Sequence, residues 1–265
     1  MRTHRPRLLL SLIASGCLAS VAAAGPERST RSGAPSVQVG FDSGDGLLIT
    51  ADLYQAHADP ATPFIVLFHQ AGWSRGEYRE IAPRLNQLGF NCLAVDQRSG
   101  SEVNEIANET AARAEADRLG TSFLDARQDL VATLSHVREN WATGPVIAWG
   151  SSYSAALLLR LAGMRPDLLD GVLAFAPGEY FIRLGKHDTW VRDGAARIRC
   201  PTFVTSARNE HERWREIFHA IPLGAGEKTA FIPESDGQHG SRALWQTFRD
   251  SGDYWAAVED FLSRW

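Results

Sequence analysis

Short hydrophobic runs alternate with amphipathic stretches along most of the chain, and this order predicts strands separated by helices. Runs that are short and apolar enough to be buried strands lie at residues 63–69, 90–96, 145–149, 171–177, 201–206 and 228–233. Between two of them, Ile81, Leu85 and Leu88 recur at helical spacing before a glycine. Strands that are apolar throughout and alternate with helices form parallel sheets covered on both faces. The pattern therefore predicts an α/β domain with a mostly parallel central sheet.

Two further extended runs precede this alternating part, at residues 36–42 and 46–54. They flank Ser43-Gly44-Asp45-Gly46, a cluster typical of a hairpin turn, so we expect an antiparallel hairpin at one edge of the sheet. No repeat or linker interrupts residues 36–265, which predicts one domain. Only about 20 residues separate the strands at 171–177 and 201–206, so no large cap domain is expected there.

The first 24 residues differ from the rest and predict a signal peptide. They begin with MRTHRPR, which has three arginines and no acid, and continue with apolar and small residues to Ala22-Ala23-Ala24, typical of a cleavage site. We therefore expect an exported protein, periplasmic or secreted, that starts at Gly25. An N-terminal anchor helix and a lipoprotein anchored through Cys17 are the alternatives. Residues 25–35 are polar and predict a flexible tail.

Composition and charge exclude several classes of protein. The chain is 44% hydrophobic and 22% charged, which excludes disordered, collagen-like and coiled-coil proteins. The net charge of -4 becomes -7 without the leader (24 basic against 31 acidic residues), so no basic surface for nucleic acid is expected. Beyond the leader, no apolar run reaches the ~18 residues of a membrane span. Cys92 and Cys200 lie in or beside apolar runs and predict two buried thiols, with a disulfide as the alternative that export permits.

A candidate nucleophile follows the apolar run 145–149. There Gly150-Ser151-Ser152-Tyr153-Ser154 forms a G-x-S-x-S sequence between a predicted strand and a helix, a variant of the nucleophile elbow. The tight turn needs small residues two before and two after the nucleophile, and Gly150 and Ser154 meet this need around Ser152. Ser151 would place Trp149 at the leading position. A serine-rich helix cap is the structural alternative.

A catalytic serine needs a histidine base that a carboxylate orients. Elbows of this kind are typical of α/β hydrolases, in which acid and histidine follow the serine in that order. After the strand at 201–206 come Asn209, Glu210 and Glu212, and Glu210 is the preferred acid because an amide cannot stabilise an imidazolium. After the last strand, His239 lies in a glycine-containing loop and is the preferred base. His69 and His211 also follow predicted strands.

The tetrahedral intermediate of such a reaction needs two preorganised N–H donors. The backbone N–H of Tyr153 lies at the start of the elbow helix. The second donor is expected after the strand at 63–69, where we predict the N–H of Ala71, with Gln70 or Gly72 as the alternatives if the loop register differs.

Together these segments resemble the α/β-hydrolase superfamily, and more closely its dienelactone-hydrolase-like bacterial branch. The resemblance covers about residues 36 to 265 and is carried, in the family's order, by LFHQAGWS, LAVDQRSG, GSSYSA, PTFVTSARNE and DGQHGS. It implies the α/β-hydrolase fold, a Ser-acid-His triad and hydrolysis through an acyl-enzyme, without a cofactor. Gln70, Ser154 and Glu210 replace the family's usual Gly, Gly and Asp. The nucleophile is Ser rather than Cys, so a dienelactone substrate is not inferred.

The loops around this site give less specific predictions. Trp73 and Tyr180 are expected near the pocket mouth and suit an apolar acyl or aryl group, although packing is an alternative role. Residues 97–123 are a long polar connection, either a mobile flap or a solvated loop. His211-Glu212 begins an H-E-x-x-H sequence, but residue 215 is Arg, so no metal site is expected.

The sequence thus predicts a serine hydrolase (EC 3.1) that cleaves carboxylic esters or related small acyl compounds. In this hypothesis Ser152 attacks, His239 transfers the proton and Glu210 holds His239. A serine peptidase of the same fold is one alternative, and a noncatalytic binding protein with an unused triad is the other. The sequence does not define the acyl group or the oligomeric state.

Overall fold

The structure, a computed structural model, describes residues 35–224 and 227–265. These residues belong to one compact unit. The predicted signal peptide (1–24), Cys17 and nearly all of the predicted tail (25–35) lie outside the described residues, so the leader, its cleavage and export stay predictions.

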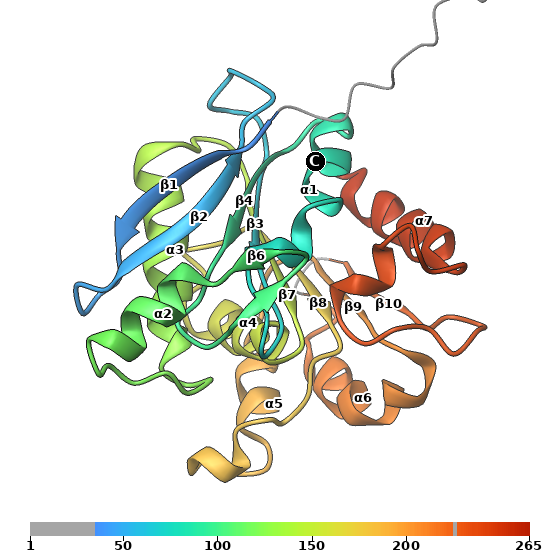
Figure 1. Cartoon of the computed structure of the whole chain (residues 1–265). Coiled ribbons are helices and arrows are strands. Elements are labelled where there is room, and N and C mark those ends of the chain that lie inside the picture. Colours follow the sequence, from blue (N-terminus) through green and yellow to red (C-terminus); the bar gives the residue numbers. More distant parts are fainter. Residues whose placement is uncertain (1–34, 225–226) are drawn as a thin grey trace, which may run out of the picture. The chain divides into compact units, whose positions relative to one another are not determined.

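The core of the fold is an eight-stranded sheet in the order β1-β2-β4-β3-β7-β8-β9-β10 (Figure 1). All pairs from β4 to β10 are parallel, while β1 and β2 pair with each other and β2 with β4 in antiparallel register. The strands are β1 (Val37–Asp42), β2 (Leu48–Tyr54), β3 (Phe64–Phe68), β4 (Asn91–Val95), β7 (Val146–Ser151), β8 (Gly171–Phe175), β9 (Thr202–Thr205) and β10 (Lys228–Phe231). This confirms the predicted parallel sheet with an antiparallel hairpin at its edge.

Helices cover both faces of this sheet, because side chains that alternate along each strand point to opposite sides. The helices are α1 (Ile81–Gln87), α2 (Glu109–Ala116), α3 (Ala126–Asn140), α4 (Tyr153–Met164), α5 (Trp190–Ala195), α6 (His211–Ala220) and α7 (Ser251–Leu262). Along β3, Val66 packs with the cluster that includes α3 and α4, whereas Ile65 and Leu67 pack with the cluster that includes α1 and α7. The sheet therefore separates two hydrophobic cores.

The polar connection at 97–123 is built from regular elements. It contains a small two-stranded sheet of β5 (Glu102–Val103) and β6 (Ile106–Ala107), followed by α2. Asn108 caps α2 by accepting a hydrogen bond from the N–H of Ala111 at 2.8 Å. The segment therefore contains two short strands and a helix, and the choice between a mobile flap and a solvated loop stays a prediction.

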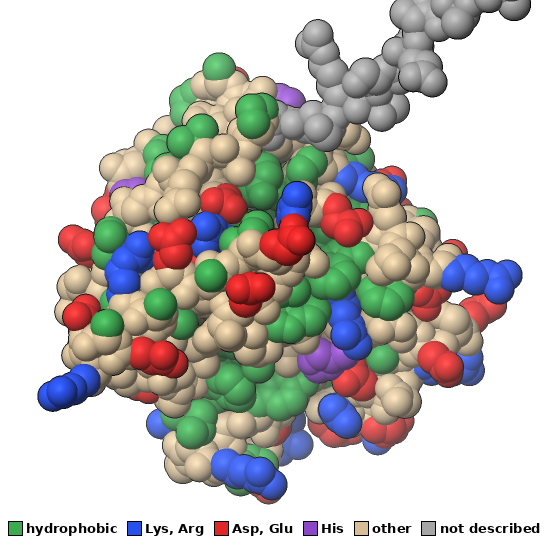
Figure 2. Space-filling view, viewed as in Figure 1, with side chains coloured by type: hydrophobic (Ala, Val, Ile, Leu, Met, Phe, Trp, Pro, Cys, Tyr) green, Lys and Arg blue, Asp and Glu red, His purple; other side chains and the backbone are tan. Residues whose placement is uncertain are grey.

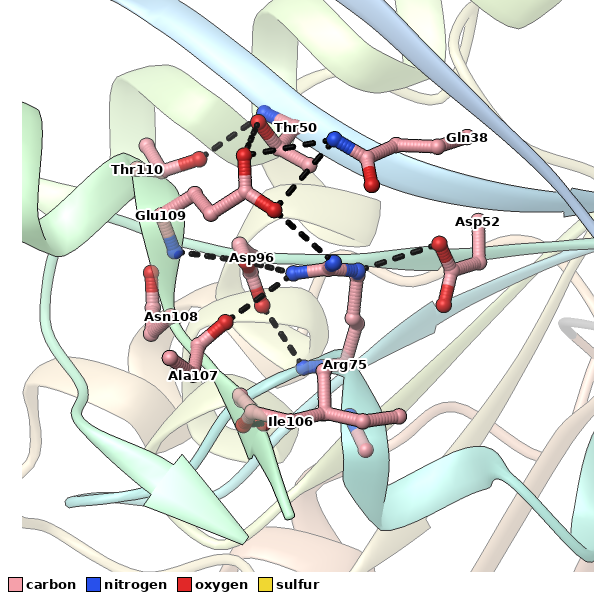
Figure 3. A network of polar contacts seen from close by, with 12 residues as sticks. Gln38, Thr50, Asp52, Arg75, Asp96, Ile106, Ala107, Asn108, Glu109 and Thr110 are labelled. Carbon is pink, nitrogen blue, oxygen red and sulfur yellow. Dashed lines mark hydrogen bonds and ion pairs between the residues drawn. The ribbon is translucent and has the colours of Figure 1, made fainter. Parts of the chain in front are cut away.

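Arg75, in the short 3₁₀ helix η1 (Arg75–Tyr78), fastens this segment to the sheet (Figure 3). Its guanidinium pairs with Asp52 on β2 at 3.1 Å, Asp96 after β4 at 2.5 Å and Glu109 on α2 at 3.1 Å. Asp96 is fully buried and also accepts from the N–H groups of Arg75 and Glu109. Burial raises the pKa of Asp96 to about 6, against the opposing charge of Arg75. One cation therefore joins three elements.

We expect Arg75→Ala to lower the free energy of unfolding by about 3–5 kcal/mol, because it leaves the buried Asp96 carboxyl without its partner. Urea unfolding measures the change. Arg79→Ala is the matched control, since Arg79 is largely exposed and lies 3.8 Å from the exposed Glu105. Equal losses of stability in the two variants would contradict the assigned role.

A second buried arginine holds the loop after β4. Arg98 pairs with Asp129 on α3 at 2.8 Å and with Asp45 in the β1–β2 turn at 2.7 Å. These contacts give both Asp96 and Arg98 a structural role at the end of β4.

Two sequence-based expectations need correction. Ile81 and Leu85 are buried, but Leu88 is exposed at the end of α1, where Gly89 with φ +98° ends the helix. Cys92 is fully buried, whereas Cys200 is only partly buried; both are free. Among the described residues, no helix has both the length and the hydrophobicity needed to cross a membrane.

Candidate active site

Ser152 lies in a sharp turn between β7 and α4, and its backbone conformation is strained. It has φ 58° and ψ -119°, a region that L-residues rarely adopt. Its N–H donates to the carbonyl of Phe175 on the neighbouring strand β8 at 2.7 Å. Ser152 is only 8% exposed. This strand-turn-helix geometry is that of a nucleophile elbow.

The small residues around Ser152 are there for steric reasons. A Cβ at Gly150 would lie 2.6 Å from the nitrogen of Ala155 and 2.7 Å from the carbonyl carbon of Ser154, both backbone atoms of α4. Ser154 donates from its hydroxyl to the carbonyl of His69 at 2.6 Å, which ties the elbow to the end of β3. The spacing G-x-S-x-S thus reflects how closely the chain returns on itself.

His239 and Glu210 meet across two loops. Nδ1 of His239 lies 2.7 Å from Oε1 of Glu210, which ends the 3₁₀ helix η3 (Arg208–Glu210) after β9. Glu210 is buried, whereas its neighbours Asn209 and Glu212 are exposed. Glu212 pairs instead with Arg215 at 2.9 Å. Of the three candidate acids, only Glu210 is in contact with His239 in the described part of the chain.

The electrostatics of this pair favour an ionised carboxylate. Burial acts to raise the pKa of Glu210, but the hydrogen bond and charge of His239, together with the charge of Arg213, lower it below its ordinary value. Arg213 lies 3.4 Å from Oε1 of Glu210. An ionised Glu210 accepts a hydrogen bond from the N–H at Nδ1 of His239, which leaves Nε2 of the ring as a proton acceptor.

The loop that carries His239 packs directly against the elbow. The N–H of Ser241 donates to the hydroxyl of Ser151 at 2.9 Å, and a Cβ at Gly240 would lie 2.4 Å from the same oxygen. The residues that follow His239 therefore contact the residue that precedes Ser152. Three sequence-predicted residues from distant segments, Ser152, Glu210 and His239, thus follow the carboxyl ends of the parallel strands β7, β9 and β10.

The loop after β3 leaves the N–H of Ala71 without a hydrogen-bond acceptor within the described chain, and the contacts of Gln70 set the direction of this N–H. The N–H of Gln70 is already bound, because it donates to Oε2 of Glu77 at 2.8 Å. The carbonyl of Gln70 faces the ring of His69, with 2.8 Å to Nδ1. In a trans peptide the following N–H points away from the carbonyl, so the N–H of Ala71 is directed away from His69. It has no acceptor among residues 35–224 and 227–265.

His69 is a buried neutral residue that positions this loop. Its Nε2 accepts from the N–H of Gln97 at 3.1 Å and from Nδ2 of Asn108 at 3.1 Å, so the proton is on Nδ1. Complete burial lowers the pKa of His69 to about 4, against the hydrogen bonds to Gln70 and Gln97. His69 therefore stays neutral at neutral pH, and His239 is left as the histidine paired with a carboxylate at the elbow.

The two predicted pocket residues have different surroundings. Tyr180 donates from its hydroxyl to the carbonyl of Ala176 at 2.7 Å. Burial and the charge of Glu210 raise the pKa of Tyr180 to about 12, and the hydroxyl of Ser152 opposes this shift. Trp73 is partly exposed and stacks on Trp245 with 5.3 Å between ring centroids. Packing is thus one role of Trp73.

On the face viewed in Figure 2, hydrophobic side chains gather beside a histidine, with acidic and basic side chains around them. Among the described residues, no group of three or more His, Cys, Asp or Glu side chains is arranged to hold a metal ion.

Sequence reasoning missed Glu77 and Gln97, which hold the loop after β3. Gln97 accepts from the N–H of His69 at 3.1 Å and donates to the hydroxyl of Tyr153 at 3.1 Å. The segments that carry them, SRGEY and DQRSG, show no periodicity that distinguishes these side chains from solvated ones. Only their burial in the folded chain identifies them.

Comparisons with known proteins give a family match and a set of similar folds. Residues 59–184 match the family model described as serine aminopeptidase, S33, a segment that includes Ala71 and Ser152 but neither Glu210 nor His239. A search of curated proteins finds no significant match.

Several solved structures share the fold. An esterase from Pyrococcus furiosus, Pf2001, aligns with a TM-score of 0.65 at 17% identity, over 87% of this chain and 92% of the esterase. A dienelactone hydrolase from Anabaena variabilis gives 0.64 at 14% identity, over 87% and 97% of the two chains. Est1E from Butyrivibrio proteoclasticus gives 0.61 at 11% identity, over 87% and 98%.

The sheet order and these structural matches show that the chain has the α/β-hydrolase fold. The fold class predicted from the sequence is confirmed, and the matching family model and the structural neighbours agree with the prediction of a hydrolase.

Proposed function

We propose that the protein is a serine esterase that hydrolyses small carboxylic esters through an acyl-enzyme. The observation that carries this proposal is the pairing of Nδ1 of His239 with the buried Glu210 at 2.7 Å, beside an elbow that holds Ser152 at φ 58°. The pair leaves Nε2 of His239 available to take the Ser152 proton.

The reaction that follows has two halves. The hydroxyl oxygen of Ser152 bonds to the ester carbonyl carbon as its proton moves to Nε2 of His239, and the carbonyl oxygen becomes an oxyanion that accepts from the N–H groups of Tyr153 and Ala71. The bond to the alcohol oxygen then breaks, and His239 returns the proton to the alcohol. Water, deprotonated by His239, attacks the acyl-serine, and the acid leaves as Ser152 regains its proton.

An aminopeptidase is the second candidate, favoured by the description of the matching family. Such an enzyme must bind a free ammonium group near the nucleophile. Arg213 lies 3.4 Å from Glu210 and adds a positive charge beside the triad, which opposes ammonium binding. Glu179, after β8, already accepts from the N–H groups of Val191 and Arg192 at 2.8 and 2.9 Å. These contacts favour an ester substrate.

The test is to compare p-nitrophenyl esters from acetate to octanoate with alanine p-nitroanilide. We expect ester turnover to exceed anilide turnover by at least about 100-fold. The ester bond is more reactive than the anilide bond, and its hydrolysis needs no subsite for an ammonium group. Faster cleavage of the anilide would favour the peptidase. No turnover of either substrate by the folded protein would favour a binding protein.

A further inference from the structure

A fully buried carboxyl group, that of Glu77, lies behind the candidate site without a role in the reaction steps above. Glu77 lies in the 3₁₀ helix η1, and its Oε2 accepts from the N–H of Gln70 at 2.8 Å. Its backbone carbonyl accepts from the indole N–H of Trp245 at 2.9 Å. Burying a carboxyl group is costly unless hydrogen bonds compensate, so its presence here calls for a specific function.

Glu77 is close to all three loops that carry the proposed catalytic groups. Gln70 directly precedes Ala71, whose N–H is the proposed oxyanion donor. Ser151 directly precedes Ser152, and its hydroxyl acts to lower the pKa of the Glu77 carboxyl. Ser241, two residues after His239, donates from its N–H to that same hydroxyl at 2.9 Å.

The pKa of Glu77 reflects its burial and its polar neighbours. Burial raises the pKa of Glu77 to about 7, and the polar groups of Ser151, Gln70 and Ser241 and the charge of Arg242 oppose this shift. The charge of Glu77 in turn acts to raise the pKa of the buried hydroxyls of Tyr78 and Tyr153. Within the described residues, the N–H of Gln70 is the one hydrogen-bond donor to this carboxyl, and its Oε1 is buried without a partner.

The peptide geometry shows what this contact controls. Glu77 holds the peptide between His69 and Gln70, because its carboxyl accepts from the N–H of Gln70. His69 holds the next peptide, between Gln70 and Ala71, through the carbonyl of Gln70. With both planes fixed, the direction of the Ala71 N–H is fixed as well. A shift of about 1 Å in such a donor is enough to cost a large factor in rate.

We propose that Glu77 is a positioning residue that sets the direction of the Ala71 N–H, the proposed oxyanion donor, through its hydrogen bond with the N–H of Gln70. This inference rests on the proposed esterase function and adds a residue to its machinery. Glu77 contacts no substrate in this role; it acts through Gln70.

Two conservative variants separate the length of the side chain from its charge. Glu77→Gln keeps the length and an acceptor oxygen for the Gln70 N–H, whereas Glu77→Asp keeps the charge but is too short to reach it. We expect Glu77→Asp to lower kcat by about 100-fold with KM unchanged within about twofold, since an oxyanion donor acts in the transition state. Glu77→Gln should stay within about tenfold of the wild type.

Glu80 provides the matched control. It is exposed, and its Oε2 also accepts a backbone N–H, that of Gln246, at 2.9 Å, but Gln246 carries none of the proposed catalytic groups. Glu80→Asp should leave kcat unchanged within about twofold. A wild-type kcat in Glu77→Asp, or a larger loss in Glu77→Gln than in Glu77→Asp, would overturn the proposal.

Amide hydrogen exchange at Gln70 gives a readout that does not depend on activity. We expect exchange at least about tenfold faster in Glu77→Asp than in Glu77→Gln. If the wild type hydrolyses no ester but exchange responds in this way, the esterase proposal fails and the positioning contact stands. If esters are hydrolysed and exchange at Gln70 is the same in all proteins, the positioning role fails alone.

Discussion

Ser152→Ala is expected to abolish ester hydrolysis, with kcat lowered by about 10⁴- to 10⁶-fold. The substitution removes the oxygen that forms the acyl-enzyme, while the N–H of Ser152 can still donate to Phe175 and the elbow can form. Initial rates with a saturating p-nitrophenyl ester measure the loss. Alanine and serine both carry a Cβ, so the backbone strain at φ 58° is the same in the variant. The fold and its far-ultraviolet circular dichroism should therefore be unchanged.

Ser151→Ala is the control for this loss. Ser151 is buried beside Ser152, but its hydroxyl accepts from Ser241 instead of facing the substrate side, so we expect a decrease of at most about 10-fold. If Ser151→Ala lost as much activity as Ser152→Ala, the choice of Ser152 as the nucleophile would be contradicted.

Glu210→Gln is expected to lower kcat by about 10³- to 10⁴-fold. A neutral amide cannot stabilise the imidazolium of His239, and its NH₂ group can donate to Nδ1 and so favour the wrong tautomer. Glu212→Gln is the matched control, since Glu212 lies two residues away, is exposed and contacts Arg215; it should change kcat by no more than about twofold. A comparable loss in both variants would remove Glu210 from the triad.

The same substitution should change how stability depends on pH. The pKa of Glu210 is lowered in the folded protein, so its contribution to stability is present above the ordinary pKa of a glutamate and is lost as pH falls through the lowered value. Urea unfolding of Glu210→Gln should therefore show a deficit against the wild type at pH 7 that shrinks at pH 3. A deficit that is equal at both pH values would contradict the ionised pair.

Much of the fold could be predicted from the sequence because its strands carry a strong pattern. The run at 145–149 is apolar throughout, and β7 is buried at every position from Val146 to Ser151. The elbow could also be placed, since only Gly fits at 150, where a Cβ would collide with the backbone of Ala155. Glu210 and His239 were named from their order after strands, and the structure places them in contact.

What the sequence could not supply depends on contacts between distant polar residues. Arg75 and Asp52, which hold residues 97–123 to the sheet, are separated by 23 positions and follow no shared period. Glu77 looks like an ordinary surface acid in SRGEY, and its burial follows only from the packing of three loops around it. The exposure of Leu88 depends on where Gly89 ends α1, a boundary that periodicity alone does not fix.

The central claim is that Ser152 is an activated nucleophile served by His239, and labelling with a fluorophosphonate tests it most directly. Intact-mass spectrometry should show one adduct on the wild type, mapped to Ser152, and none on folded Ser152→Ala or His239→Ala, because the reagent reacts only with a serine whose proton a base removes. A folded wild type that stays unlabelled, or an adduct that persists in Ser152→Ala, would contradict the account.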